Sequence, residues 1–397
     1  MKTKKIVLAA LVALSSFAYA LDFGGSLGTY SKLGTPSYPK DGEFKNFSLK
    51  QDEILTGWLR YNINPTTFIA AEAEAKYRFY STDLETSDAS ETVLIYDLKT
   101  LRFFKKINAG TSSIGFNAGR FNFTDLSGLI LSQTSDGALI TADFSSIFLK
   151  AYANYTGLLN AQNVTILNKQ GSEYKLDTKK GYYFAPAYTN LALDVEFPYL
   201  FANQTVSAEF LASLASPGAK KGSDSYNRIH GTLGLNGYLL RHLCYALTST
   251  VGSELSDGEG ISNLTKLNFT ILPDVKDIAI SLNGIYASGD QMGLKPFKGF
   301  TSMTAVNSYS EPEYTSLIKA ELNASIKPTE KLLVGAYGNA IFSWPESDIE
   351  YYGTEAGLNI GIQIFSDLGI NATVSQFFPK NSEEKKAIFT LSTNLAF

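Results

Sequence analysis

The residues that could carry out chemistry in this chain are few and stand apart. His230 and His242 are its only histidines and Cys244 is its only cysteine, which excludes a zinc site built from several such ligands and a disulfide framework. No serine near either histidine stands in a Gly-x-Ser-x-Gly context, and no P-loop, dinucleotide-binding glycine pattern or EF-hand spacing is present. The sequence therefore predicts no enzyme active site, no cofactor and no metal centre.

What the chain does offer is charge at every second position. Between Thr67 and Tyr80 one set of alternate positions is charged and the other is apolar. A helix would scatter both sets around its circumference, so the alternation predicts a two-faced β-strand. The charged face holds Glu72, Glu74, Lys76 and Arg78, and the other holds Ile69, Ala71, Ala73, Ala75, Tyr77 and Phe79.

The same two-faced pattern returns in three later segments, Tyr226–Leu239, Tyr314–Lys327 and Tyr351–Ile364. Each has about 10–14 residues, the length of a tilted strand that crosses a bilayer or extends slightly past it. No stretch after the first twenty residues is long and apolar enough for a membrane-spanning helix. If the protein lies in a membrane, it must therefore cross it with strands.

The connections between the predicted strands alternate in length, as in outer-membrane barrels with short periplasmic turns and longer external loops. We count eighteen strands, or sixteen if Ala138–Asp143 is a loop, and an even number puts both termini on one side. Short turns are predicted at 62–65, 108–110, 143–146, 199–203, 240–242, 273–276, 327–330 and 366–369, and longer connections at 31–50, 81–91, 124–137, 157–180, 216–225, 288–313 and 379–385.

The first twenty residues read as a targeting segment. Lys2, Lys4 and Lys5 precede an apolar run from Ile6 to Phe17, and Ala18-Tyr19-Ala20 matches a signal-peptidase site. We therefore predict that residues 1–20 are a signal peptide and that residues 21–397 form a single exported domain.

Composition agrees with a folded chain that does not bind nucleic acid. Hydrophobic residues make up 44% and charged residues 18%, and the formal net charge is only −4, unlike a disordered chain. A pI near 5.5 gives no reason to expect a nucleic-acid partner. A soluble β-sandwich would also alternate, but polar faces rich in small and hydroxyl residues favour a closed barrel with a watery interior.

The end of the chain carries a resemblance to a known class. From Ala387 to Phe397 apolar residues recur at every second position and the last residue is Phe, with Thr393 as a departure. This strand resembles the C-terminal insertion signal of bacterial outer-membrane β-barrel proteins. The resemblance implies an all-β, transmembrane antiparallel barrel in a Gram-negative-type outer membrane, in contact with lipid and recognised by the barrel-assembly machinery through the strand ending at Phe397. A homo-oligomer is left open.

In such a barrel the charged faces would line the lumen. The positive and negative side chains on these faces roughly cancel. This balance predicts many cross-strand ion pairs and no strong preference for ions of one sign. Because sixteen to eighteen strands enclose more space than side chains fill, we predict a porin-like channel for passive diffusion of small hydrophilic solutes. The predicted lining is Arg60, Lys76, Arg78, Lys150, Arg228, Lys266 and Lys319 with Glu72, Glu74, Asp194, Glu209, Asp277, Glu321 and Glu355.

One stretch resembles the constriction of bacterial porins, where a Gly-Arg pair at a strand end precedes a loop that folds into the barrel. Here Gly119-Arg120 precedes the connection 124–137. The resemblance implies that Arg120, Asp125 and Asp136 face each other across the lumen. The alternative is a tight surface loop that ends in an Asp-Gly turn.

The sequence leaves two other functions open. A carrier of hydrophobic compounds similar to FadL would need an N-terminal hatch, for which Leu21–Lys50 is short. A barrel that acts as an adhesin or structural tether would use the connections 157–180 and 288–313 as its contact surface.

Overall fold

The computed structural model describes residues 21–35, 47–82, 90–168, 180–216, 226–255, 260–273, 277–290, 293–301, 315–343, 348–380 and 386–397. The predicted signal peptide, residues 1–20, lies outside this set. An 18-stranded sheet accounts for most of the described residues, together with the short 3-10 helix η2 (Ala161–Asn163). The prediction of eighteen strands is confirmed, and Ala138–Asp143 is strand rather than loop.

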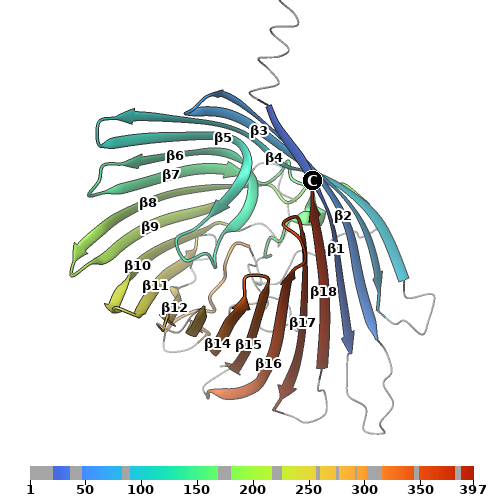
Figure 1. Ribbon diagram of the computed structural model, residues 1–397. Helices are drawn as coiled ribbons and strands as arrows, with labels where there is room; N and C mark the ends of the chain where they lie inside the picture. Colours follow the sequence, from blue (N-terminus) through green and yellow to red (C-terminus); the bar gives the residue numbers. More distant parts are fainter. Residues whose placement is uncertain are drawn as a thin grey trace, which may run out of the picture.

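The strands follow one another around the sheet in sequence order (Figure 1). They are β1 (Leu21–Thr35), β2 (Ser48–Asn64), β3 (Thr67–Ser81), β4 (Ser90–Ala109), β5 (Ser112–Thr124), β6 (Ser132–Asp143), β7 (Phe148–Tyr155), β8 (Tyr188–Phe201), β9 (Gln204–Ala215), β10 (Arg228–Leu240), β11 (Leu243–Glu254), β12 (Ser262–Ile271), β13 (Ile278–Ala287), β14 (Leu317–Thr329), β15 (Leu332–Ser343), β16 (Glu350–Gln363), β17 (Leu368–Pro379) and β18 (Lys386–Ala396).

The sheet closes on itself because β18 pairs with β1. The antiparallel register runs from Ser26↔Ala396 to Thr35↔Ala387, and Gly25 and Phe397 exchange two backbone hydrogen bonds of 2.8 and 2.9 Å. Closure leaves neither the first nor the last strand as an open edge, as a structure surrounded by hydrocarbon requires. The predicted transmembrane antiparallel barrel is therefore the observed fold.

The two faces of the strands differ as the sequence predicts. Large apolar side chains such as Leu55, Leu233 and Leu322 are exposed on the outside, whereas Glu74 and Glu355 are buried on the inside. An outer surface of this kind is stable against lipid and not against water. No helix among the described residues is long and apolar enough to cross a bilayer.

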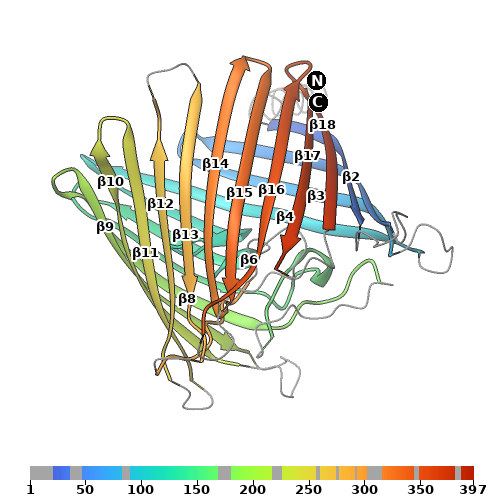
Figure 2. The same ribbon diagram turned by 90° about the horizontal axis from the view of Figure 1, so that it is seen from below.

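The connections between the strands differ in length. Figure 2 shows β9 to β18 side by side along one wall, joined alternately by short and long connections. The chain turns within a few residues at one end, for example between Asn64 and Thr67. One long connection is shorter than predicted, because β6 begins at Ser132 and leaves only residues 125–131 between β5 and β6.

Candidate pore lining and constriction

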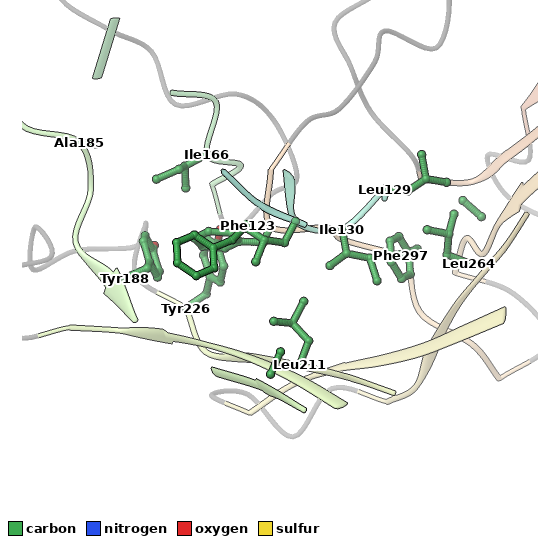
Figure 3. Close-up of a cluster of buried hydrophobic side chains, with 14 of the residues drawn as sticks. Phe123, Leu129, Ile130, Ile166, Ala185, Tyr188, Leu211, Tyr226, Leu264 and Phe297 are labelled. Atoms are coloured by element: carbon green, nitrogen blue, oxygen red, sulfur yellow. The ribbon is translucent and has the colours of Figure 1, made fainter. Parts of the chain in front are cut away.

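Three connections fold into the barrel and pack together there. Segments 125–131, 156–168 and 293–301 bring apolar side chains such as Leu129, Ile166 and Phe300 into one buried cluster. The cluster also contains Leu211 of β9 and Leu264 of β12 (Figure 3). We call these three segments the inner loop cluster. Their buried side chains lie on the inner side of the wall and fill part of the lumen.

The first of these segments is ordered by one carboxylate. Asp125 accepts hydrogen bonds from the backbone N–H groups of Ser127 (2.8 Å), Ile130 (3.1 Å) and Leu131 (2.8 Å). A short polar side chain that satisfies several backbone donors fixes a tight loop. Asp125 is itself buried, so it shapes the loop from within.

The same segment reaches strands and loops far away in the sequence. The Leu126 N–H donates to Glu209 Oε1 of β9 over 3.0 Å. The Ile130 carbonyl accepts from Phe300 N (3.0 Å) and Thr301 N (2.8 Å). These contacts place segment 125–131 inside the lumen rather than on the outer surface.

Arg228, the first residue of β10, binds the segments 156–168 and 293–301 through hydrogen bonds. Arg228 is only 2% exposed and donates to the carbonyls of Gly299 and, over 2.9 Å, Asn168. Its guanidinium lies 3.6 Å from the ring centre of Tyr226, whose hydroxyl donates to Leu167 O. Burial raises the pKa of the Tyr226 phenol, so it stays protonated as a donor.

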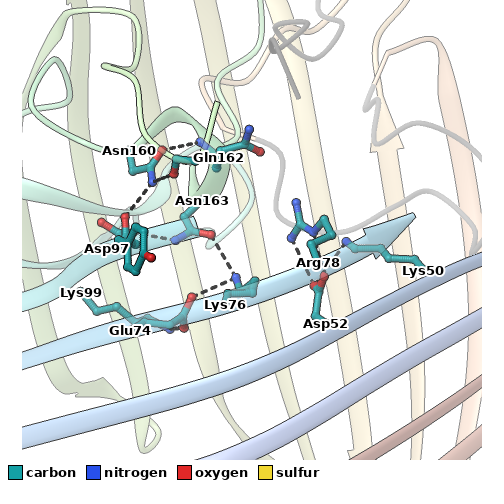
Figure 4. A network of polar contacts seen from close by, with 12 residues as sticks. Lys50, Asp52, Glu74, Lys76, Arg78, Asp97, Lys99, Asn160, Gln162 and Asn163 are labelled. Carbon is teal, nitrogen blue, oxygen red and sulfur yellow. Dashed lines mark hydrogen bonds and ion pairs between the residues drawn. The ribbon is translucent and has the colours of Figure 1, made fainter. Parts of the chain in front are cut away.

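A network of charges lies on β2 to β4 (Figure 4). Glu74 forms ion pairs with Lys76 at 3.0 Å and with Lys99 at 3.1 Å, and the Lys99 pair is also a hydrogen bond. Asn163 of η2 accepts from Lys76 over 3.0 Å and donates to Asp97 over 2.7 Å. The network therefore joins the wall to segment 156–168 through polar groups only.

A polar cavity of about 370 Å³ lies between this wall and the inner loops. Its lining includes Lys76, Asp97 and Lys99 from the wall, and Gln133 and Asn163 from the side of the inner loops. Charges of both signs and side-chain amides can replace part of a solute's hydration without favouring one sign strongly. We call this space the polar cavity.

The three residues of the predicted constriction do not all come together. Arg120 and Asp136 are register partners on β5 and β6 and form a bidentate pair at 2.9 and 2.7 Å. They are therefore in direct contact rather than on opposite sides of open lumen. Asp125 is engaged by its own loop, as described above. Their role in a constriction stays a prediction.

Other predicted lining residues have close partners, as expected for cross-strand pairing. Lys150 donates to Thr124 O over 2.9 Å and lies 3.7 Å from Asp194. The remaining contacts are Arg78 with Asp52 (2.8 Å), Lys319 with Glu321 (2.7 Å), Glu355 with Tyr337 (2.8 Å), and Arg60 with Asn62 (2.9 Å) and the ring of Phe68 (3.9 Å). Glu72 lies partly buried on the inner face of β3.

The predicted lining omitted Asp97, Lys99 and Asn163. For Asp97 and Lys99 the sequence held a usable pattern, because they alternate with Tyr96 and Leu98 within β4. No sequence pattern indicated Asn163, because it lies in the connection between β7 and β8, whose position depends on contacts with distant residues. No group of three or more His, Cys, Asp or Glu side chains is placed to hold a metal ion in the described part of the chain.

These features define a porin-like β-barrel with inward-folded loops. No protein-family model matches the sequence, and no match was found among curated proteins. The solved structures to which the chain is similar include three of proteins from Pseudomonas aeruginosa. For OccK11 (OpdR) the TM-score is 0.60 at 11% identity, with 95% of this chain and 96% of that chain covered. For OpdK with vanillate the TM-score is 0.60 at 11% identity, with 95% of this chain and 99% of that chain covered. For OccK3 (OpdO) the TM-score is 0.57 at 14% identity, with 95% of this chain and 96% of that chain covered. At these identities the likeness shows a shared fold.

Proposed function

We propose that this protein is an outer-membrane channel for the passive diffusion of small hydrophilic solutes. The observation that carries the proposal is the polar cavity, which lies inside a closed barrel with an apolar outer surface. A lumen of this kind admits water and small polar molecules and excludes larger ones by the inner loop cluster. The similar OpdK structure holds vanillate, which supports a small organic molecule as solute.

The proposal includes an order of events during export. Residues 1–20 would be removed as a signal peptide, and the β18 strand that ends at Phe397 would be recognised by the barrel-assembly machinery. The position of β18 is consistent with a role in closing the barrel during assembly, because it pairs along its length with both β17 and β1. Catalysis has no part in the proposed function.

The arrangement of the described segments favours this function over its alternatives. Residues 21–35 form β1 of the wall and so do not supply the hatch that a FadL-like carrier requires. Residues such as Ile166 and Phe300 lie in the buried inner cluster, so these parts of the connections 157–180 and 288–313 do not offer an adhesive outer surface.

Planar-bilayer recording of the purified full-length mature protein tests the proposal. Stepwise conductance increments are expected, with current carried by both K⁺ and Cl⁻ because the lining is mixed. A correctly folded protein that inserts and passes no ion current would overturn it.

A further inference from the structure

The barrel wall is not one continuous ladder between β4 and β5. Their register runs only from Ala109↔Ser112 to Leu101↔Arg120, whereas β4 pairs with β3 as far as Ser90. Beyond Arg120 the tip of the β5–β6 hairpin turns into the lumen. Residues 90–100 of β4 are therefore left without a ladder partner from β5, and hydrocarbon does not tolerate an open edge.

The connection between β7 and β8 takes the place of the missing hairpin tip. Ala161 N donates to Tyr183 O over 2.8 Å, and Ala185 N donates to Leu159 O over 3.0 Å. These bonds extend the β7–β8 pair as a narrow strip of residues 156–161 and 181–187. We call it the β7–β8 ribbon.

Side chains of the ribbon alternate like those of a wall strand. Leu159 and Ala185 belong to the buried cluster inside the barrel. Leu158, Tyr182 and Phe184 are exposed. The ribbon therefore presents an apolar outer face and stands in for wall at this height.

Two side chains, rather than a ladder, join the ribbon to β4. Arg120 donates to Leu98 O over 3.1 Å and to Leu158 O over 3.0 Å. Asn160 donates through Nδ2 to Tyr96 O over 2.9 Å. We call this junction the β4 seam. Side-chain bonds of this kind can be exchanged for bonds to a ligand without unfolding a sheet.

An apolar hollow of about 580 Å³ opens on the outer side of the seam. Its floor is a row of small residues, Gly25, Gly57 and Ala73, which are register partners across β1, β2 and β3. Tyr96 and Tyr182 stand at the end next to the seam. The volume falls within the range of roughly 300–1,000 Å³ found for small-molecule sites.

Only one layer of wall separates this hollow from the polar cavity. Glu74, Asp97 and Leu98 line both spaces. Lys99 occupies an irregularity in the β3–β4 register between Leu98 and Thr100, and its side chain is 44% exposed. Irregularities of this type re-aim a side chain, and here the ammonium group of Lys99, which pairs with Glu74 at 3.1 Å, lies in the lining of the polar cavity directly behind the seam.

We infer that the β4 seam is a lateral binding site for a single-chain amphiphile with a carboxylate head, such as a long-chain fatty acid. The hydrocarbon tail lies in the hollow along Gly25, Gly57 and Ala73, and the head passes the seam to Lys99. A single row of small residues accommodates one chain rather than the several chains of a membrane lipid. The inference goes beyond the proposed function, because it assigns to the barrel wall a binding site for an amphiphile beside the path that small hydrophilic solutes take through the lumen.

Photolabelling with a diazirine derivative of palmitic acid tests the tail site in liposomes that contain the full-length mature protein. In Gly57→Trp the indole fills the hollow, and no atom lies within 4 Å of a Cβ added at Gly57, so the barrel should fold. The matched control is Gly231→Trp on β10, where an added Cβ also meets nothing within 4 Å and the register neighbours Phe210 and Val251 are exposed apolar residues.

We expect wild type and Gly231→Trp to be labelled at the β7–β8 ribbon, and Gly57→Trp to lose that labelling several-fold while all three conduct equally. Equal labelling of Gly57→Trp with intact conductance would overturn the inference and leave the channel in place. Absence of conductance in wild type would instead overturn the proposed function.

The head site is tested by Lys99→Gln with two probes of equal length. This change should weaken labelling by the fatty acid several-fold and leave labelling by the matching long-chain alcohol unchanged. If both probes lose labelling equally, or neither does, Lys99 does not bind the head and the inference fails.

Discussion

Arg120 is a charge held inside the barrel wall by four hydrogen bonds. It is 7% exposed, pairs with Asp136 and bonds two carbonyls. Arg120→Ala should lower the free energy of unfolding by about 1–3 kcal/mol, because it removes charge-assisted hydrogen bonds to Asp136 and takes a donor from the carbonyls of Leu98 and Leu158. Urea unfolding in detergent micelles measures this change.

An exposed ion pair supplies the control for that prediction. Lys380 lies 3.8 Å from Glu350 and both are more than half exposed. Lys380→Ala should change the free energy of unfolding by only about 0–1 kcal/mol. A loss for Arg120→Ala no larger than this would contradict the bracing role of Arg120.

Lys99 allows the electrostatics of the polar cavity to be tested. Lys99→Glu adds a negative charge beside Glu74 and Asp97, so the lumen should attract cations more strongly. The reversal potential in a KCl gradient should move toward the value for K⁺. Lys331→Glu, in the exposed turn between β14 and β15, should move it much less, and equal shifts for the two variants would show that Lys99 does not line the conducting path.

Among the elements, segment 125–131 is a loop stabilised by one of its own side chains, Asp125. Asp125→Ala removes the acceptor for three backbone N–H groups, so the segment should loosen and move away from the lumen centre. We expect a higher and noisier single-channel conductance. Asp143→Ala, which removes a similar bond of 3.0 Å to Ser145 N in a short turn, should leave the conductance unchanged. An unaltered conductance in Asp125→Ala would show that the segment does not narrow the pore.

Gly119 sets the point at which β5 leaves β4. Its φ is +114°, and a Cβ added there would lie 1.9 Å from Leu101 O. A residue other than glycine is strained in this region by about 1–3 kcal/mol, before the clash is counted. Gly119→Ala should reduce the yield of folded, heat-modifiable barrel on gels, whereas Gly231→Ala should not. Normal folding of Gly119→Ala would mean that the divergence does not depend on this backbone conformation.

The elements were largely predictable from the sequence because a strand with one lipid face and one watery face must alternate. The prediction for Thr67–Tyr80 matches β3 closely, and the end of the chain matches β18. Errors arose where alternation continues through a connection. The start of β6 at Ser132 was missed, because its first residues pair with β5 inside the lumen and not with β7.

At the scale of the whole molecule, the inner loop cluster was the least predictable part. Arg228 was predicted to line open lumen, but segments 60 and 71 residues away cover it. Ile130 and Thr301, which are hydrogen-bonded, are 171 residues apart. Contacts of this range depend on the closed barrel, and no local pattern encodes them. The sequence could therefore indicate a mixed lining but not which part of it stays accessible.

A water-filled barrel that spans a membrane requires the charged strand faces to point inward and the apolar faces to point outward. Cysteine substitution along β14, in a Cys244→Ser background, tests this orientation directly in liposomes with a membrane-impermeant sulfonate thiol reagent. Cysteines at Lys319, Glu321 and Asn323 should react, because they face water inside the barrel. Cysteines at Ile318, Ala320 and Leu322 should be protected by lipid. Equal reactivity of the two sets, or the reverse pattern, would contradict a water-filled barrel spanning a membrane.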